Sequence, residues 1–215
     1  MRNMPRAIPR ILICGIVCLQ SCQVPPRSGS PVSCSYRSNA GNPDRAELQP
    51  RGNRAYAIDG KIFVRRSVLS ELDFSGGLAA IHAERFGWLF VKRDGSTVPT
   101  VTFDNGPDVF SEGLARYLDR GKMGFIDRSG KVMIKAQYGF ASPFQSGHSA
   151  VCNDPVVRMT GEHQLIRSGH WGCIDRSGRL VLPMKFSDEE IRAKLRRMGR
   201  ERSGAADPAH ASSPM

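Results

Sequence analysis

The sequence predicts an all-β fold: a tandem array of antiparallel β-hairpin repeats, about three and a half of them, closed by a C-terminal helix. A turn motif recurs along the chain, and its glycines are spaced 35, 35 and 48 residues apart. Short runs rich in Phe, Ile, Val and Trp flank each turn, as is typical of strands. The turn residues are Asp59 and Gly60, Asp94 and Gly95, Asp127 and Gly130, and Asp175 and Gly178.

The turn residues predict the geometry of each unit. An Asp at the first position of a type I turn accepts a hydrogen bond from the backbone two residues on, and a Gly at the fourth adopts positive φ at little cost. Asp59-Gly60 is instead the two-residue signal of a type I′ hairpin. We therefore expect each unit to be a pair of short strands around a tight turn. Because a lone hairpin is barely stable in water, neighbouring units are expected to share a core.

A second landmark recurs in step with the turns. A Phe followed three residues later by Gly precedes three of the hairpins, at 74–77, 110–113 and 144–147. The longest gap between turn glycines is the same unit carrying an insertion, which we place at 153–169. Insertions in repeat arrays map to loops, and loops carry function more often than their scaffolds.

Two of the copies resemble the WG-repeat family. Its hallmark, a Trp-Gly pair before a Phe-Ile-Asp-x-x-Gly-Lys hairpin, is similar to FSEGLARYLDRGKMGFIDRSGK (110–131) and GHWGCIDRSGR (169–179). The resemblance extends over residues 56–186, with Met123 in place of Trp and Leu89 in place of Gly. It implies an all-β repeat architecture, common in bacterial proteins, and no general catalytic activity.

The N-terminus predicts export. Within the expected signal peptide, residues 1–21, three arginines precede an apolar run at 11–19 that is too short to span a bilayer. The Leu-Gln-Ser-Cys sequence ending at Cys22 resembles the lipobox of bacterial lipoproteins, which implies acylation of Cys22 after cleavage. By analogy with lipoprotein sorting, Gln23 favours the outer membrane, with the domain facing the periplasm. A soluble exported protein, cleaved by an ordinary signal peptidase, is the alternative.

The rest of the chain divides by composition. Residues 22–55 are rich in Pro, Ser, Gly, Asn and Arg and predict a disordered tether; the β-repeat domain follows at 56–186. Ser187 and Glu190 form a capping box that opens a helix over 187–202, and 203–215 is expected to be a disordered tail. We expect the helix to cap the last unit; contact of its basic face with anionic lipid is the alternative.

Composition and motifs favour a non-catalytic binding or scaffolding module. The net charge of +11 is spread along the chain rather than gathered in a stripe, which argues against nucleic-acid binding. No metal-ligand spacing, nucleotide loop or catalytic motif is present, so we predict no metal, no cofactor and no catalytic residue. The expected partner is an envelope protein or a polysaccharide. A secreted enzyme with a site on the 153–169 insertion is the alternative, with Glu162, His163 and the adjoining His170 as the residues to test.

Two pairs of residues have two interpretations each. Trp88 and Trp171 occupy equivalent places in their units, where they are either core side chains or rings that stack on a ligand. Cys152 and Cys173 lie in one unit and are expected to be diagonal neighbours on one face. They are either bridged by a disulfide or two buried thiols.

Overall fold

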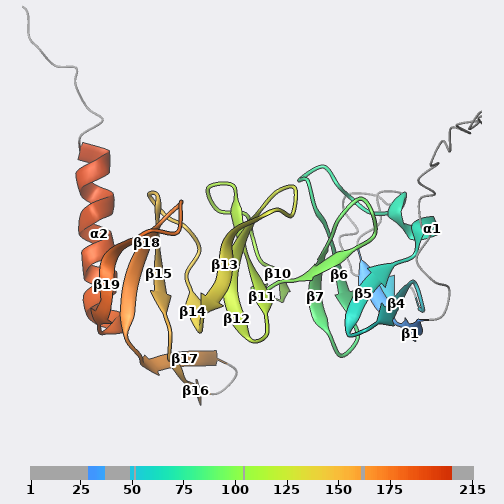
Figure 1. The fold of residues 1–215 in the computed structure, drawn as a ribbon, viewed down its shortest axis with the longest axis horizontal. Helices are drawn as coiled ribbons and strands as arrows, with labels where there is room; N and C mark the ends of the chain where they lie inside the picture. Colours follow the sequence, from blue (N-terminus) through green and yellow to red (C-terminus); the bar gives the residue numbers. More distant parts are fainter. Residues whose placement is uncertain (1–28, 37–48, 51, 104, 161–162, 205–215) are drawn as a thin grey trace, which may run out of the picture.

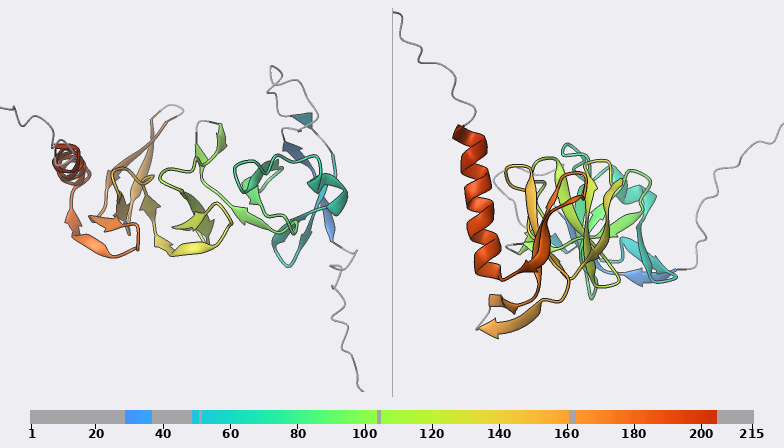
Figure 2. Two further views of the ribbon diagram at one scale, coloured as in Figure 1. Left: turned by 90° about the horizontal axis from the view of Figure 1, so that it is seen from above. Right: turned by 60° about the vertical axis from the view of Figure 1, so that its left-hand side comes forward.

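The structure, a computed structural model, describes residues 29–36, 49–50, 52–103, 105–160 and 163–204. The expected signal peptide and Cys22, and all of the expected tail after Gly204, lie outside these residues. In the described part of the chain, short antiparallel sheets follow one another in a row, with α2 at one end and α1 and β1 at the other (Figure 1). The view from above shows the same single row (Figure 2).

Four main sheets make the row, and all their strand pairs are antiparallel. They are ordered β1-β4-β5, β3-β2-β6-β7-β8, β11-β12-β13 and β14-β15-β18-β19; two small ones are β10-β9 and β16-β17. The strands are β1 Ser30–Val32, β2 Cys34–Tyr36, β3 Gln49–Pro50, β4 Ala55–Ile58, β5 Lys61–Val64, β6 Ala79–Ala83, β7 Gly87–Val91, β8 Thr97–Pro99, β9 Thr102–Phe103, β10 Gly106–Pro107, β11 Leu114–Asp119, β12 Lys122–Asp127, β13 Val132–Tyr138, β14 Phe140–Ala141, β15 His148–Cys152, β16 Val156–Thr160, β17 His163–Ser168, β18 Trp171–Asp175 and β19 Leu180–Phe186. The helices are α1 Arg66–Leu69 and α2 Asp188–Gly204.

The repeat is confirmed, but each full unit has one strand more than a hairpin. The predicted pairs around the turns are β7 with β8, β12 with β13, and β18 with β19. A third strand, β6, β11 or β15, joins each pair on the other side. It begins one or two residues after the glycine of the Phe-x-x-Gly landmark, so the two sequence landmarks belong to one three-stranded meander.

The turn geometry follows its residues. Asp127 Oδ1 accepts hydrogen bonds from the Ser129 N–H at 2.8 Å and the Lys131 N–H at 3.0 Å, and Asp175 is bonded in the same way. Gly130 has φ +79°, and Asp59 and Gly60 are both at positive φ, as a type I′ turn requires. Asp94 differs from the prediction. The turn that ends at Gly95 starts at Lys92, because the Gly95 N–H donates to the Lys92 carbonyl. Asp94 is therefore the third residue of the turn, and its carboxylate accepts from the Ser96 N–H.

The glycine of the Trp-Gly pair is explained by a bulge. In the last two units the register between the second and third strands shifts around Gly124 and Gly172. A Cβ on Gly124 would stand 2.5 Å from the Ala136 nitrogen, and one on Gly172 would stand 2.8 Å from a backbone oxygen. Leu89 holds the same place in the second unit, where the pairing with β8 is regular and a side chain fits.

Each core lies between neighbouring sheets. Side chains of the second and third sheets, such as Phe90 and Tyr117, form one core, and those of the third and fourth, such as Phe125 and Val151, form the next. Links that reach one unit along the chain accompany the apolar contact: the Thr97 hydroxyl donates to the Ile62 carbonyl, and the Gly147 N–H to the Glu112 carboxylate. The units therefore stabilise one another, as predicted.

The helix α2 covers the outer face of the last sheet. Its buried Ile191 and half-buried Leu195 pack against Trp171 and Cys173 in a fourth core. The capping box is formed, because the Ser187 N–H donates to Glu190 at 2.8 Å and the Glu190 N–H donates to the Ser187 hydroxyl at 3.3 Å. The expected capping role is thus seen in the contacts of α2.

The structure differs from the predicted tether. Residues 30–36 form β1 and β2, which pair with β4 and β6, and Val32, Cys34 and Tyr36 are buried in the first core. Sequence composition misses them because only alternate residues of this short segment are apolar, between polar stretches on both sides. The folded domain therefore begins before residue 56, within the segment assigned to the tether.

Replacing Tyr36 with phenylalanine tests this docking. The Tyr36 hydroxyl donates to the Glu71 carboxylate at 2.7 Å, so its loss is expected to lower the free energy of unfolding by about 1.5 kcal/mol. Urea unfolding measures the change. Tyr56→Phe is the control, because the Tyr56 ring stacks on Phe63 and its hydroxyl has no partner in the described residues. Equal stability of Tyr36→Phe and the parent chain would mean that the segment is not docked.

The turn aspartates make the stability of the fold depend on pH in the acid range. Hydrogen bonds from the Ser177 hydroxyl and the Arg179 N–H lower the pKa of Asp175 from 3.8 to about 2. A lowered folded-state pKa stabilises the fold above the unfolded value, and this stabilisation is lost as pH falls from 3.8 towards 2. We expect Asp175→Asn to be less stable than the parent chain at pH 5 and the difference to vanish near pH 2. Urea midpoints across that range measure it; a difference independent of pH contradicts the assignment.

Candidate functional site

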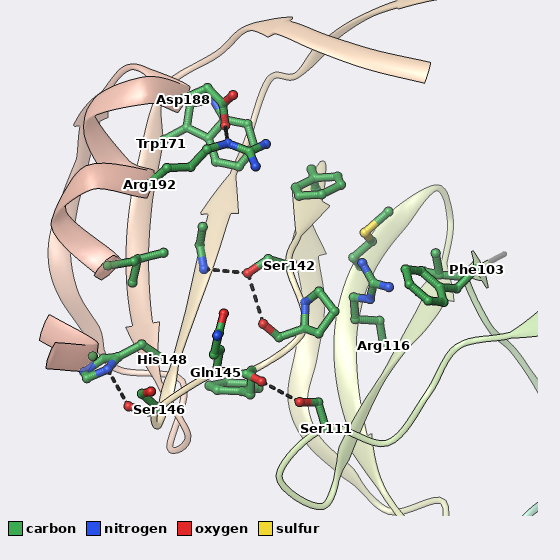
Figure 3. A pocket seen from close by; sticks show the side chains of 18 of the residues that line it. Phe103, Ser111, Arg116, Ser142, Gln145, Ser146, His148, Trp171, Asp188 and Arg192 are labelled. Carbon is green, nitrogen blue, oxygen red and sulfur yellow. Dashed lines mark hydrogen bonds and ion pairs between the residues drawn. The ribbon is translucent and has the colours of Figure 1, made fainter. Parts of the chain in front are cut away.

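A groove of about 1320 Å³ runs beside the last two units. Helix α2 forms one wall, residues of β14, β15 and β18 line the floor, and residues from β9, β11 and β12 form the opposite side. Figure 3 shows α2 on one side of the groove and Phe103 on the other, with Ser142 between them. The groove is therefore a product of stacking, because no single unit contains all of its surfaces.

The α2 wall is basic. Arg192, Arg196 and Arg200 line the groove and follow one another at four-residue intervals, so they share one side of the helix. All three are exposed. Arg192 is paired with Asp188 at 2.7 Å, whereas Arg196 and Arg200 make no hydrogen bond or ion pair within the described part of the chain. Two cations on this wall are thus uncompensated.

The floor is aromatic and closely packed. The Phe140 and Trp171 rings meet edge to face with their centroids 5.4 Å apart. Trp171 is 1% exposed, and among the described residues its Nε1–H has no hydrogen-bond acceptor. A buried donor without an acceptor carries a desolvation cost of about 1–3 kcal/mol. It is therefore an unusual feature at the edge of a groove.

The side opposite α2 contains a buried ion pair. Arg116 and Asp108 are 5% and 3% exposed. The Arg116 Nε donates to Asp108 Oδ2 at 3.0 Å, and the Arg116 N–H donates to the same oxygen at 2.7 Å. The Arg116 Nη1 reaches the Ala141 carbonyl of the next unit at 3.1 Å. The pair is neutral as a whole and joins two units, so its role here is to build the groove wall.

Polar groups of the floor are mostly occupied by the backbone. The Ser142 hydroxyl accepts from the Ala150 N–H at 2.9 Å, and the Ser149 hydroxyl donates to the Ser142 carbonyl at 2.7 Å. The His148 Nδ1 lies 2.9 Å from the Ser146 carbonyl. In the described residues no carboxylate is bonded to His148, whose ring nitrogen contacts a backbone carbonyl instead. These polar groups therefore hold the strands of the floor together.

The tryptophans support the core interpretation. Trp88 is 8% exposed, and Trp171 is less exposed still. Trp88 packs edge to face with His82. A ring stacks on a sugar only through an exposed face, so of the two interpretations of Trp88 and Trp171 the structure favours core side chains over ligand stacking. Only Trp171 lines the groove, and it does so as part of the packed floor.

The cysteines are buried free thiols. Cys152 lies opposite Trp171 and Cys173 opposite Ala150, which makes the two cysteines diagonal neighbours, as predicted. Both are free and fully buried. Burial raises the pKa of both thiols, to about 11 for Cys173, which disfavours the nucleophilic thiolate at neutral pH. Cys34, expected in the tether, is a third free and buried thiol in β2.

The insertion forms a hairpin of its own, β16 with β17. Its base is closed by Asp154, whose carboxylate accepts from the His170 N–H at 3.0 Å and lies 3.0 Å from the His170 Nδ1. Both side chains are more than half exposed. The side chains of Glu162 and His163 lie outside the described residues, so the enzyme alternative rests on His170 alone, which holds the insertion closed.

Two further findings bear on function. Within the described residues, no three His, Cys, Asp or Glu side chains are grouped closely enough to hold a metal ion. No helix in the same part of the chain combines the length and apolar character needed to cross a bilayer.

Sequence reasoning missed two parts of the site. The Asp108–Arg116 pair matches no sequence motif. Arg116 is a charged residue in the middle of a largely apolar strand, and that position could have indicated a buried ion pair. The basic residues of α2 were recognised, but the groove beside them depends on the placement of two units. The turn aspartates, which were predicted, lie in the β-turns and outside the groove.

Comparison with known proteins supports the repeat assignment. The family model described as WG containing repeat matches residues 123–154 and 171–188, the last two units. No curated protein and no solved structure matches the chain. The matched segments carry the bulge glycines and the Asp-Arg-Ser-Gly turns described above. Residues 123–154 and 171–188 are therefore WG repeats, as the resemblance predicts.

Proposed function

We propose that this chain is an exported, lipid-anchored protein of the bacterial cell envelope whose β-repeat domain is a non-catalytic binding module. Its partner is another envelope component, a protein or a polysaccharide. The anchor is an acylated Cys22, and the domain faces the periplasm from the outer membrane.

The observation that carries the binding role is the groove between the last two units and α2. It combines an uncompensated basic wall with an apolar floor, which is the make-up of a ligand site. The acidic side chains nearest to it have structural tasks. Asp108 is bonded to Arg116, and Asp188 to Arg192. Together these features support recognition and offer no acid or base poised for catalysis.

The anchor rests on the sequence of the N-terminus. A basic start, a short apolar run and Leu-Gln-Ser-Cys ending at Cys22 are in the order that a lipoprotein signal requires. A single acyl chain binds membranes only marginally, so stable anchoring needs the several chains that lipoprotein processing adds.

Metabolic labelling tests the anchor. Cells that express the full chain are given an alkyne-tagged fatty acid, and the purified chain is examined for the tag. We expect the parent chain to be labelled, Cys22→Ala to lose the label, and Cys18→Ala to keep it. Equal labelling of the Cys22→Ala chain would show that Cys22 is not the acylated residue, and an unlabelled parent chain would favour the soluble exported alternative.

Crosslinking in intact cells followed by purification tests the binding role. The bait is the full chain, because a fragment starting at residue 56 lacks β1 and β2 of the first core. We expect one envelope component to be recovered reproducibly. Recovery of nothing from cells at native expression would contradict a binding function.

A further inference from the structure

We propose that the groove binds an extended acidic peptide segment of a partner protein, one in which acidic side chains alternate with apolar ones. This inference rests on the proposed binding function and specifies its ligand. It follows from four features: the charges of the α2 wall, the spacing of those charges, the apolar groove floor, and the edge of β14, whose backbone groups are already hydrogen-bonded.

Charge complementarity requires an anionic ligand. Of the cations that line the groove, Arg116 is neutralised by Asp108 and Arg192 by Asp188. Arg196 and Arg200 are exposed and have no anionic partner in the described part of the chain. A ligand with carboxylates along one side would pair with both, and guanidinium groups bind carboxylates in a bidentate manner.

The spacing of the arginines matches an extended chain. Residues four apart on a helix are displaced by about 6 Å along its axis. Alternate residues of an extended peptide point to the same side and are displaced by about 6.6–6.8 Å. Acidic residues at every second position of a ligand strand would therefore meet Arg196 and Arg200 in turn, while the intervening side chains point away from the helix.

The floor suits those intervening side chains. Phe140 and Pro143 of the floor and Met123 of the side opposite α2 provide apolar surface in the groove. A polysaccharide fits less well, because the Trp171 ring is buried and its face cannot stack on a sugar.

The ligand is recognised by its side chains rather than by strand addition. The strand at this edge of the last sheet is β14, and the free edge of a strand commonly pairs with a peptide. Here the Ala141 N–H donates to the Met123 sulfur at 3.3 Å, and the Ala141 carbonyl accepts from Arg116. The preceding unit thus blocks the backbone of β14.

A labelled synthetic peptide of nine residues that alternates glutamate with leucine tests the proposal. Fluorescence anisotropy measures its binding to the full chain in detergent solution. We expect saturable binding that weakens with added salt. Two control peptides, one with glutamine in place of glutamate and one with the glutamates and leucines in separate blocks, are expected to bind at least tenfold more weakly. Equal binding of the blocked peptide would overturn the extended arrangement.

Variants of α2 locate the binding. Arg196→Glu combined with Arg200→Glu is expected to weaken peptide binding at least tenfold, whereas Arg197→Glu, on the same helix but outside the groove lining, is expected to have less than a twofold effect. Thermal unfolding of each variant checks that the fold is kept. In a Trp88→Phe background, Trp171 is the only tryptophan, and its emission is expected to change when the peptide binds.

Anionic lipid is the competing ligand. If phosphatidylglycerol vesicles bind the full chain through Arg196 and Arg200 while the peptide does not bind, the α2 wall is a membrane contact and the proposal fails. If neither binds but crosslinking still recovers a partner, the proposed binding function holds and this ligand assignment is wrong. If Arg197→Glu reduces binding as much as the double variant, the groove is not the site.

Discussion

Replacing Arg116 with methionine is expected to lower the free energy of unfolding by about 3–5 kcal/mol. The change removes one partner of a buried ion pair and leaves the Asp108 carboxylate, which is 3% exposed, without a countercharge. It also removes the hydrogen bond from Arg116 to the Ala141 carbonyl that links the last two units. Urea unfolding measures the loss, and the m-value shows whether the units still unfold together.

Two variants show whether the unpaired charge is the cause. Adding Asp108→Asn to Arg116→Met removes the charge but keeps an oxygen for the Arg116 backbone N–H, so the double variant is expected to regain most of the lost stability. Arg179→Met breaks an exposed pair with Asp175 and is expected to cost less than about 1 kcal/mol. A double variant less stable than Arg116→Met alone would contradict the explanation.

Replacing Gly77 with alanine is expected to lower the free energy of unfolding by about 3–4 kcal/mol, which combines backbone strain with overpacking. Gly77 has φ +103°, where an L side chain is strained, and its Cβ would overlap the Arg128 carbonyl oxygen of the next unit. The clash is with backbone, so no side-chain rotation relieves it. The same urea experiment measures the change.

Gly121→Ala separates the two contributions. Gly121 has φ +73°, but nothing lies within 4 Å of the Cβ that alanine would add. Only the backbone strain applies, and the expected cost is about 1–2 kcal/mol. If both glycines cost the same when replaced, the contact between the second and third units is looser than the structure indicates.

Local chemistry made much of this fold predictable. The Asp-x-x-Gly turns specify their own hydrogen bonds, so the positions of Asp127, Gly130 and Asp175 follow from a few adjacent residues. The repeat period then places similar strands side by side. The capping box at Ser187 is likewise set by residues three apart, which is why the start of α2 could be read directly from the sequence.

Contacts between distant residues were not predictable. β2 pairs with β6 across more than forty residues, and neither strand indicates the other. The bond from Arg116 to Ala141 spans 25 residues and two units. The groove has the same origin, since Phe103 and Arg196 come together only through the stacking of complete units. A single sequence therefore predicts local turns well and contacts between distant residues poorly.

The position of α2 also limits growth. Every inner sheet buries both of its faces against neighbours, so the outermost sheet without Ile191 and Leu195 would offer a bare apolar surface to another copy. If a bare apolar end met a complementary surface on the next copy in the head-to-tail direction, an open fibre would form. The terminal helix removes that apolar end by packing Ile191 and Leu195 against it.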